Sequence, residues 1–316
     1  MTGHTGPVHV VTYSKGAATY CLSGGQDRSI RLWNPTNGKE IKKYEAHGYE
    51  VLSVACSYDN AKIASGGGDK SLFYWDVATG QTIRRIPGHL GRINAVAFNE
   101  DASVVVSSIF LWYLNSPGLG LTRVLGSFDA TVKIWDLKAQ ARSPIQSLDD
   151  SRDAIQTLYV GTQEITSGSV DGHIRTYDLR KGQLTSDYLG HPVTSIVPTK
   201  DLQTLLVTTL DGKIRLMDRK TGQCLNTFQG HKHESYRCRS VLDIKEEAVI
   251  LGDEDGRIWA WDLVTAASLT SGLPPKVHEK TILWTEYHPI AEGQLLTASA
   301  DGRIILWGEE ERMQED

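Results

Sequence analysis

The chain has 316 residues, a net charge of −5 and a pI near 6.1, with 40% hydrophobic and 22% charged residues. These values are ordinary for a globular protein, and they exclude the broadly basic surface that holds a nucleic-acid backbone. The four cysteines lie far apart, the N-terminus lacks the pattern of a signal peptide, and no apolar run is long enough to span a bilayer. We therefore expect an intracellular protein that binds neither nucleic acid nor a membrane directly.

One submotif recurs seven times along the chain: an Asp, an aliphatic residue three positions on, and a bulky residue three beyond that. The copies are Asp27/Ile30/Trp33, Asp69/Leu72/Trp75, Asp129/Val132/Trp135, Asp171/Ile174/Tyr177, Asp211/Ile214/Met217, Asp255/Ile258/Trp261 and Asp301/Ile304/Trp307. Successive bulky residues are 42, 60, 42, 40, 44 and 46 positions apart. A period of 40–50 residues is typical of propeller blades. The sequence thus predicts a single all-β domain over 1–316, a seven-bladed β-propeller.

Each unit is expected to form four short strands. In the second unit these are 51–57, 62–65, 72–76 and 82–86, separated by turns rich in Gly and Asp. Four of the later units carry Asp-Gly, which favours a tight hairpin because its backbone readily adopts positive φ. The aliphatic and bulky residues of each third strand are uncharged, so they should pack between neighbouring blades.

The units resemble WD40 repeats. The resemblance rests on Gly-His dipeptides upstream and Trp-Asp dipeptides downstream, at Gly3–His4, Gly88–His89, Gly190–His191, Gly230–His231, Trp75–Asp76, Trp135–Asp136 and Trp261–Asp262. In that family a His, a Ser or Thr, the turn Asp and the Trp form a hydrogen-bonded tetrad. The matching sets here are His4, Ser23, Asp27 and Trp33; His47, Ser65, Asp69 and Trp75; and His278, Thr297, Asp301 and Trp307. Repeated His–Asp pairs are therefore interpreted as architecture and not as catalytic dyads.

Three blades depart from the tetrad. The fourth has no His at 149–151, and the fifth and sixth carry Val207 and Leu251 where the hydroxyl belongs. We expect these blades to depend more on packing.

The 60-residue step contains an apolar insertion in the third blade. Removing 108–125 restores a 42-residue step and joins Ser107 directly to Gly126. One interpretation is a hydrophobic loop that docks a partner, and the other, which we favour, is a gene-model artefact such as a translated intron. In either case the blade should form normally with 108–125 as a protruding loop, since lengthening a loop about fivefold costs only about 1.5 kcal/mol.

The two ends leave the last blade incomplete. Only Met1 and Thr2 precede the first Gly-His, and 308–316 form a charged tail without a strand pattern. We expect the seventh blade to lack its outer strand, which would leave an unpaired edge. Our hypothesis is that the true start lies upstream of Met1.

Segments outside the generic repeat resemble the mitogen-activated protein kinase organizer family. They are 46–52, 65–70, 167–180, 186–188 and 230–236, together with the fourth unit that lacks a His. The resemblance covers nearly the whole chain except 108–125 and the termini. It implies a scaffold in the extracellular-signal-regulated kinase cascade that is also found with the spliceosome. It further implies a location in cytoplasm and nucleus and a monomer within larger complexes.

Family placement puts exposed side chains just after each blade histidine and just before each turn Asp. The resulting partner-binding candidates are Gln26, Tyr49, Glu50, Arg92, Asn94, Phe128, Ser235, Arg237 and Glu254. Arg and aromatic residues on such a rim are plausible anchors for a protein partner. The alternative is a merely solvated loop face. Tyr49 departs from the generic repeat and is the first residue to test.

Two other functions have weaker sequence support. Residues 177–180, Tyr-Asp-Leu-Arg, resemble the Trp-Asp-x-Arg box by which some propellers dock onto cullin-type ubiquitin ligases, with Tyr in place of Trp. Motifs for hydrolases, metalloproteases and phosphate-binding loops do not occur in the sequence, so neither enzyme activity nor a cofactor is expected. His231 and His233 have the spacing of metal ligands, but no third ligand lies at a suitable distance.

Overall fold

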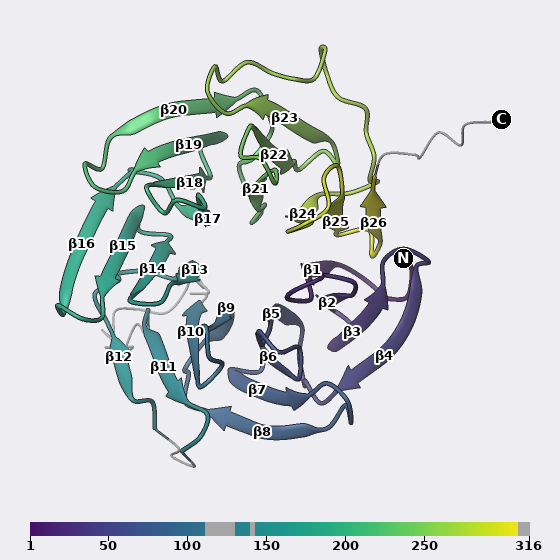
Figure 1. Cartoon of the computed structure of the whole chain (residues 1–316), viewed down its shortest axis with the longest axis vertical. Coiled ribbons are helices and arrows are strands. Elements are labelled where there is room, and N and C mark those ends of the chain that lie inside the picture. The colour runs from purple at the N-terminus through teal and green to yellow at the C-terminus, as the bar shows by residue number, and fades with distance from the viewer. Residues whose placement is uncertain (111–129, 140–142, 309–316) are drawn as a thin grey trace, which may run out of the picture.

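The computed structural model describes residues 1–110, 130–139 and 143–308. These residues form seven antiparallel sheets arranged as a ring around a central axis (Figure 1). The prediction of an all-β, seven-bladed propeller is confirmed. Among the described residues no helix is long and apolar enough to cross a membrane.

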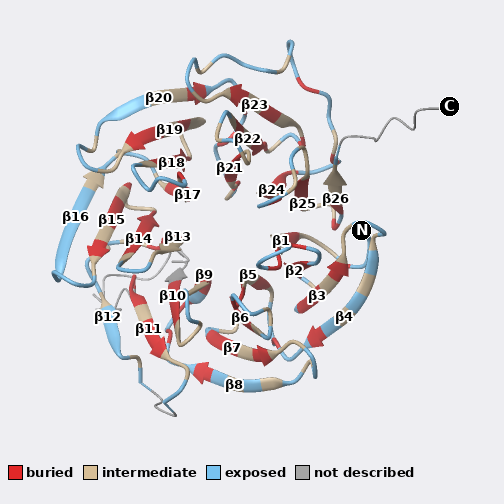
Figure 2. Ribbon diagram, viewed as in Figure 1, coloured by how far each residue is buried: buried red, intermediate tan, exposed pale blue. Residues whose placement is uncertain are grey.

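Five blades have four strands each. Their strands are β1 Val8–Tyr13, β2 Cys21–Gly25, β3 Ser29–Asn34 and β4 Lys39–Glu45; β5 Val51–Cys56, β6 Lys62–Gly67, β7 Ser71–Asp76 and β8 Thr82–Pro87; β9 Arg92–Phe98, β10 Val104–Phe110, β11 Val132–Asp136 and β12 Gln146–Leu148; β13 Ile155–Val160, β14 Glu164–Ser169, β15 His173–Asp178 and β16 Gln183–Tyr188; and β17 Val193–Pro198, β18 Thr204–Thr209, β19 Lys213–Asp218 and β20 Cys224–Gln229. In each blade the strands follow one another from the channel to the periphery. Figure 2 shows that exposed residues gather on the outermost strands, whereas buried residues lie on the inner three.

Blades 6 and 7 have three strands each. They are β21 Ser240–Leu242, β22 Ala248–Gly252 and β23 Ile258–Asp262, then β24 Ile282–Tyr287, β25 Leu295–Ser299 and β26 Ile304–Trp307. Outside β23 the chain makes only isolated bridges, Trp261 with Ser268 and Arg257 with Lys276. Pro274 and Pro275 lie in this segment and supply no backbone N–H, which explains why a regular fourth strand does not form.

The open edge of blade 7 is partly covered by the first two residues of the chain. The Met1 amino group donates to the carbonyl of Ile304 at 2.6 Å, and the Ile304 N–H donates back to Met1 at 3.1 Å. Thr2 forms an antiparallel bridge with Arg303. Figure 1 shows the N-terminus beside β26. The sheet is three-stranded, as expected, but Met1 and Thr2 occupy the position of the outer strand.

In the third blade, strand β10 extends three residues into the segment that we expected to be the insertion. Ser108, Ile109 and Phe110 continue β10 and pair with Ala95, Ile93 and Arg92 of β9. They thus fill the ladder positions that we expected 126–128 to take. The rest of the insertion, 111–125, lies outside the described residues, as does the charged tail apart from Gly308.

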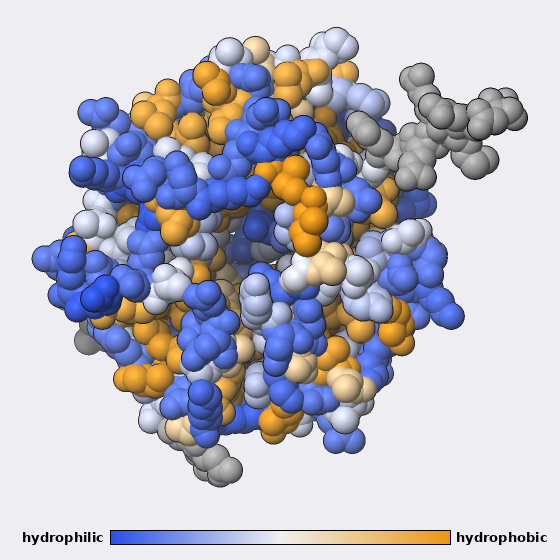
Figure 3. Space-filling model, viewed as in Figure 1, coloured by the Kyte–Doolittle hydropathy of each residue, from blue (hydrophilic) through white to orange (hydrophobic). Residues whose placement is uncertain are grey.

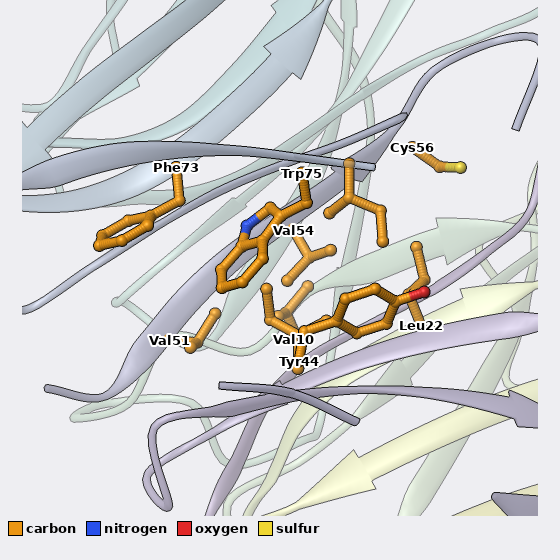
Figure 4. Packing of buried hydrophobic residues seen from close by; sticks show 10 residues of the cluster. Val10, Leu22, Tyr44, Val51, Val54, Cys56, Phe73 and Trp75 are labelled. Atoms are coloured by element: carbon orange, nitrogen blue, oxygen red, sulfur yellow. The ribbon is translucent and has the colours of Figure 1, made fainter. Parts of the chain in front are cut away.

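The core lies between neighbouring blades. Between blades 1 and 2, Trp75 of β7 packs against Val10, Leu22 and Tyr44 of blade 1, with Val54 beside it (Figure 4). In six of the seven blades the bulky residue of the third strand packs in this way against the preceding blade, as expected for residues between neighbouring blades. Each interface therefore depends on both of its blades, as in repeat proteins whose units contact their neighbours.

Candidate docking face and the polar clusters behind it

One end of the ring gathers the loops before each innermost strand and the turns between each second and third strand. We call this end the His-loop face, and the other end the opposite face. In blades 1, 2, 4 and 7 polar clusters hold the two kinds of loop together. The clusters determine which side chains the His-loop face exposes.

In blade 2 the predicted tetrad forms a continuous hydrogen-bonded chain. The Nδ1 of His47 lies 2.7 Å from Oδ2 of Asp69, and its Nε2 lies 2.7 Å from Oγ of Ser65. Since the carboxylate can only accept, Nδ1 carries the hydrogen and Nε2 accepts from the Ser65 hydroxyl. That hydroxyl oxygen in turn accepts the indole N–H of Trp75 at 2.8 Å. The turn Asp is thereby joined to the hydrophobic core through the imidazole of His47 and the hydroxyl of Ser65.

Blades 1 and 7 have the same arrangement at 2.7–2.9 Å, through His4, Ser23, Asp27 and Trp33, and through His278, Thr297, Asp301 and Trp307. Burial would raise the pKa of Asp27, but hydrogen bonds from His4 and Ser29 hold it well below its usual value. Blade 3 adds a set that the sequence analysis did not identify. Its His89 lies 2.6 Å from Ser107, whose Oγ accepts the Trp135 indole at 2.9 Å. The set was missed because the insertion separates His89 and Ser107 from Asp129 and Trp135 in the sequence.

In blades 4 and 5 an arginine four positions after the turn Asp supplies the donors, and in blade 5 the half-exposed His191 lies 3.8 Å from Asp211. Arg175 donates through Nη1 and Nη2 to the two carboxylate oxygens of Asp171, at 3.1 and 2.8 Å, and through Nη1 to Ser169 at 2.9 Å. Arg215 makes the same forked contact with Asp211. Blades 4 and 5 therefore do not depend on packing alone, because a guanidinium donates to the turn Asp where blade 2 uses an imidazole. The pattern Asp-x-x-x-Arg, also present at Asp27 and Arg31, is the sequence signal for this contact.

Blade 6 uses a different aspartate. Asp253 is buried and accepts the indole N–H of Trp259 at 2.8 Å, whereas the repeat's Asp255 is about half exposed and faces Lys232 at 3.3 Å.

Neither ring nitrogen of the buried His231 has a hydrogen-bond partner among the described residues. Burial and the neighbouring His233 lower the pKa of His231 to about 3, so the ring stays neutral. No group of three His, Cys, Asp or Glu suited to a metal occurs in the described part of the chain.

The rim carries several of the predicted partner-binding residues. Tyr49 is 60% exposed at the loop before β5, and Gln26 is exposed at the β2–β3 turn. Glu50 and Arg92, from the loops of blades 2 and 3, form an ion pair at 3.1 Å. An exposed pair of this kind contributes roughly 0.2–1 kcal/mol, so it orients the two loops more than it stabilises the fold.

Glu254 supports a neighbouring loop of blade 6 on the rim. Its Oε1 accepts the backbone N–H groups of residues 234–236 at 2.6–2.8 Å. The loop exposes Ser235 and also Tyr236, whose side chain is 53% exposed. Glu254, predicted to contact a partner, also uses one carboxylate oxygen to position these exposed residues.

Asn94 and Arg237 lie inside the channel and not on the rim, which corrects two predictions. Asn94 is buried, and its amide donates to the carbonyl of Ile155 in blade 4 at 3.1 Å. Arg237, from blade 6, donates to the carbonyl of Asn94 at 2.8 Å across the channel. Contacts between distant blades of a ring cannot be read from local spacing. Phe128, the remaining candidate, lies outside the described residues.

Two exposed residues of the rim were missed. Leu90 follows His89 and is 56% exposed, and Tyr236 lies three residues after His233. Both belong to the loops that follow a blade histidine, the same signal that identified Tyr49. Together with Tyr49 they give the His-loop face three large apolar side chains.

The Tyr-Asp-Leu-Arg segment forms a turn at the opposite face. Asp178 accepts the backbone N–H groups of Arg180 and Lys181 at 2.9 Å, and Asp218 and Asp262 make equivalent turns in their blades. The Asp of this segment is therefore part of the common blade geometry. Arg180 is exposed and donates to Gln163 at 3.3 Å.

Comparison with known proteins agrees with this architecture. The model of the "WD domain, G-beta repeat" family matches residues 1–34, 38–76 and 80–136. WD repeat domain-containing protein 83 from Rattus norvegicus is 41% identical over 92% of the chain and 85% of the relative, and that from Xenopus tropicalis is 45% identical over 91% and 84%. The Dictyostelium discoideum homolog is 31% identical over 98% of the chain and 97% of its own length. A propeller with these repeats and these relatives is a WD40 repeat protein, and the chain belongs to the family of WD repeat domain-containing protein 83.

Proposed function

We propose that this protein is a non-catalytic scaffold that assembles components of a mitogen-activated protein kinase cascade on its His-loop face. The observation that carries the proposal is a rim of exposed large side chains, Tyr49, Leu90 and Tyr236, on loops that internal hydrogen bonds hold in place. Aromatic residues on rigid supports make good anchors for a protein partner, because little conformational entropy is lost on binding.

The sequence resemblance to the mitogen-activated protein kinase organizer family supports the signalling context. We propose cytoplasm and nucleus as its locations, and assemblies of the pre-mRNA splicing machinery as a second context. In both, the protein acts as a monomer within a larger complex and contacts proteins, with no direct role for nucleic acid or membrane.

Affinity purification of the full chain from cells, followed by mass spectrometry, tests this proposal. Kinase-cascade components, with or without spliceosomal proteins, are the expected partners. Recovery of a cullin ligase adaptor in their place, lost on Arg180→Ala, would favour the substrate-receptor alternative. Recovery of neither class would reject the scaffold proposal.

We expect Tyr49→Ala to weaken capture of kinase-cascade partners on the order of tenfold or more, as is usual for an aromatic anchor. Tyr20→Ala is the matched control, since Tyr20 is 44% exposed but lies in the β1–β2 loop at the opposite face. Binding measured by pull-down or titration should fall only for Tyr49→Ala. Equal binding by both variants would show that the side chain of Tyr49 is merely solvated.

A further inference from the structure

The innermost strands line a central channel with a cavity of about 500 Å³ near the opposite face. Figure 3 shows the hollow at the centre of the ring, with hydrophilic residues deep inside it. The walls from blades 2–4 are mostly small or apolar, whereas blades 6 and 7 contribute charge. The charged residues of the lining are Lys15, Glu100, Arg237, Arg239 and Glu286.

Two arginines share one aromatic ring in this channel. The guanidinium of Arg239 lies 4.7 Å from the ring centre of Trp284, and that of Arg237 lies 5.3 Å from it. Arg239 forms an ion pair with Glu286, which also accepts the Trp284 indole N–H at 3.3 Å. One carboxylate therefore serves two neighbouring cations.

Arg237 is the cation left without a counter-charge. It forms no ion pair with a described residue, and its buried Nε has no hydrogen-bond partner among them. Burial, and to a lesser extent repulsion by Arg239, lowers the pKa of Arg237 to about 10, so the side chain remains charged at neutral pH. A largely buried charge without a partner is costly, and an incoming anion would offset that cost.

The mouth of the cavity favours the same sign of ligand. Lys15 follows the end of β1, is exposed, and forms no ion pair with a described residue. Glu100 is the only other charged residue that the lining has at this mouth, and Glu286 is already occupied deeper inside. The described lining thus has three cations and two carboxylates. Of the cations without an ion pair, Lys15 lies at the mouth and Arg237 at the inner end.

We propose that this channel is a second docking site, which receives the carboxylate side chain of an acidic segment from a partner protein. The segment enters from the opposite face, its carboxylate binds the guanidinium of Arg237, and its methylene groups contact Trp284. A cavity of about 500 Å³ admits a few side chains but no folded domain. Since this mouth lies away from Tyr49, the protein could hold two partners at once.

A fluorescein-labelled hexaglutamate peptide tests this proposal, with hexalysine as the matched control and the full chain titrated by fluorescence anisotropy. Hexaglutamate should bind and hexalysine should not. Lys15→Glu should weaken binding, and Glu286→Gln should strengthen it, because that variant removes the competing carboxylate. We expect each change to be on the order of three- to tenfold.

Two variants separate this site from the His-loop face and from folding defects. Tyr49→Ala should leave hexaglutamate affinity unchanged, so the two docking sites can fail independently. Lys15 is exposed, so its substitution should not impair folding even if Glu286→Gln does. Absence of hexaglutamate binding, or binding unaffected by both Lys15→Glu and Glu286→Gln, would overturn the proposal. Stabilisation of the folded protein by inorganic phosphate, without any binding of the peptide, would also overturn it, since that result would indicate a site for a free anion.

Discussion

Replacing Trp75 by alanine is expected to reduce the free energy of unfolding by about 3–5 kcal/mol. The indole is only 1% exposed, fills the interface between blades 1 and 2, and donates its N–H to Ser65 at 2.8 Å. Its loss creates a cavity and leaves the Ser65 hydroxyl with one partner fewer. For a ring of this size the expected fall in Tm, measured by calorimetry, is roughly 4–8 °C.

Trp307→Ala is the matched control for this prediction. Trp307 makes the same hydrogen bond, to Thr297 at 2.9 Å, but its side chain is only partly buried, because Met1 and Thr2 alone extend blade 7 outside β26. The fall in Tm should be clearly smaller than for Trp75. Equal losses would show that the hydrogen bond, and not the interblade packing, provides most of the stabilisation.

Arg175→Leu is expected to destabilise the protein by roughly 2–4 kcal/mol at neutral pH. The substitution keeps a buried aliphatic chain but removes the fork that neutralises Asp171, whose side chain is 10% exposed. Backbone N–H groups of Arg152 and His173 still bind the carboxylate, which keeps the loss at the lower end for a broken buried pair. Arg180→Leu, at an exposed site, is the control.

The effect of Arg175→Leu should depend on pH. Burial alone would raise the pKa of Asp171, but hydrogen bonds from Arg175 and Ser169 lower it to about 2. A carboxyl group whose pKa is lowered on folding stabilises the native state above its unfolded pKa, and that stabilisation disappears as pH falls through the folded pKa. The difference between wild type and variant should therefore be full above about pH 4 and shrink toward pH 2. A difference that stays constant over this range would mean that Arg175 acts by packing alone.

Local sequence patterns were sufficient to predict the fold. The recurrence of Asp, an aliphatic residue and a bulky residue identifies each third strand. In six blades the bulky residue packs against the preceding blade, where it meets that blade's aliphatic residue. The interblade packing of Trp75 and the tetrad of His47 follow from spacing, since their partners lie at fixed offsets in one unit. The same logic identified Tyr49, because residues after a blade histidine are directed toward the rim.

The predictions that differ from the structure concern contacts between distant parts of the chain. Arg237 and Asn94 are 143 positions apart and meet only because the ring closes. Glu254 was assigned to the surface because its interaction with the backbone of 234–236 leaves no side-chain pattern. In blade 6, Asp253 replaces Asp255 because the indole of Trp259 reaches it, a choice that depends on packing.

Arginine substitution within blades 4 and 5 was predictable but overlooked. Asp171 and Arg175, like Asp211 and Arg215, share one face of a short turn and strand, four residues apart. A turn aspartate without a close histidine partner in a repeat of this kind should prompt a search for such a cation, because a buried turn aspartate requires donors.

Cross-linking of a captured kinase-cascade partner to the full chain, read by mass spectrometry, tests the location of the docking face most directly. Lys70, Lys232 and Lys280 lie at the His-loop face, whereas Lys181 and Lys220 lie in third-to-fourth-strand turns at the opposite face. The rim proposal predicts cross-links to the first group. Cross-links confined to Lys181 and Lys220 would contradict it.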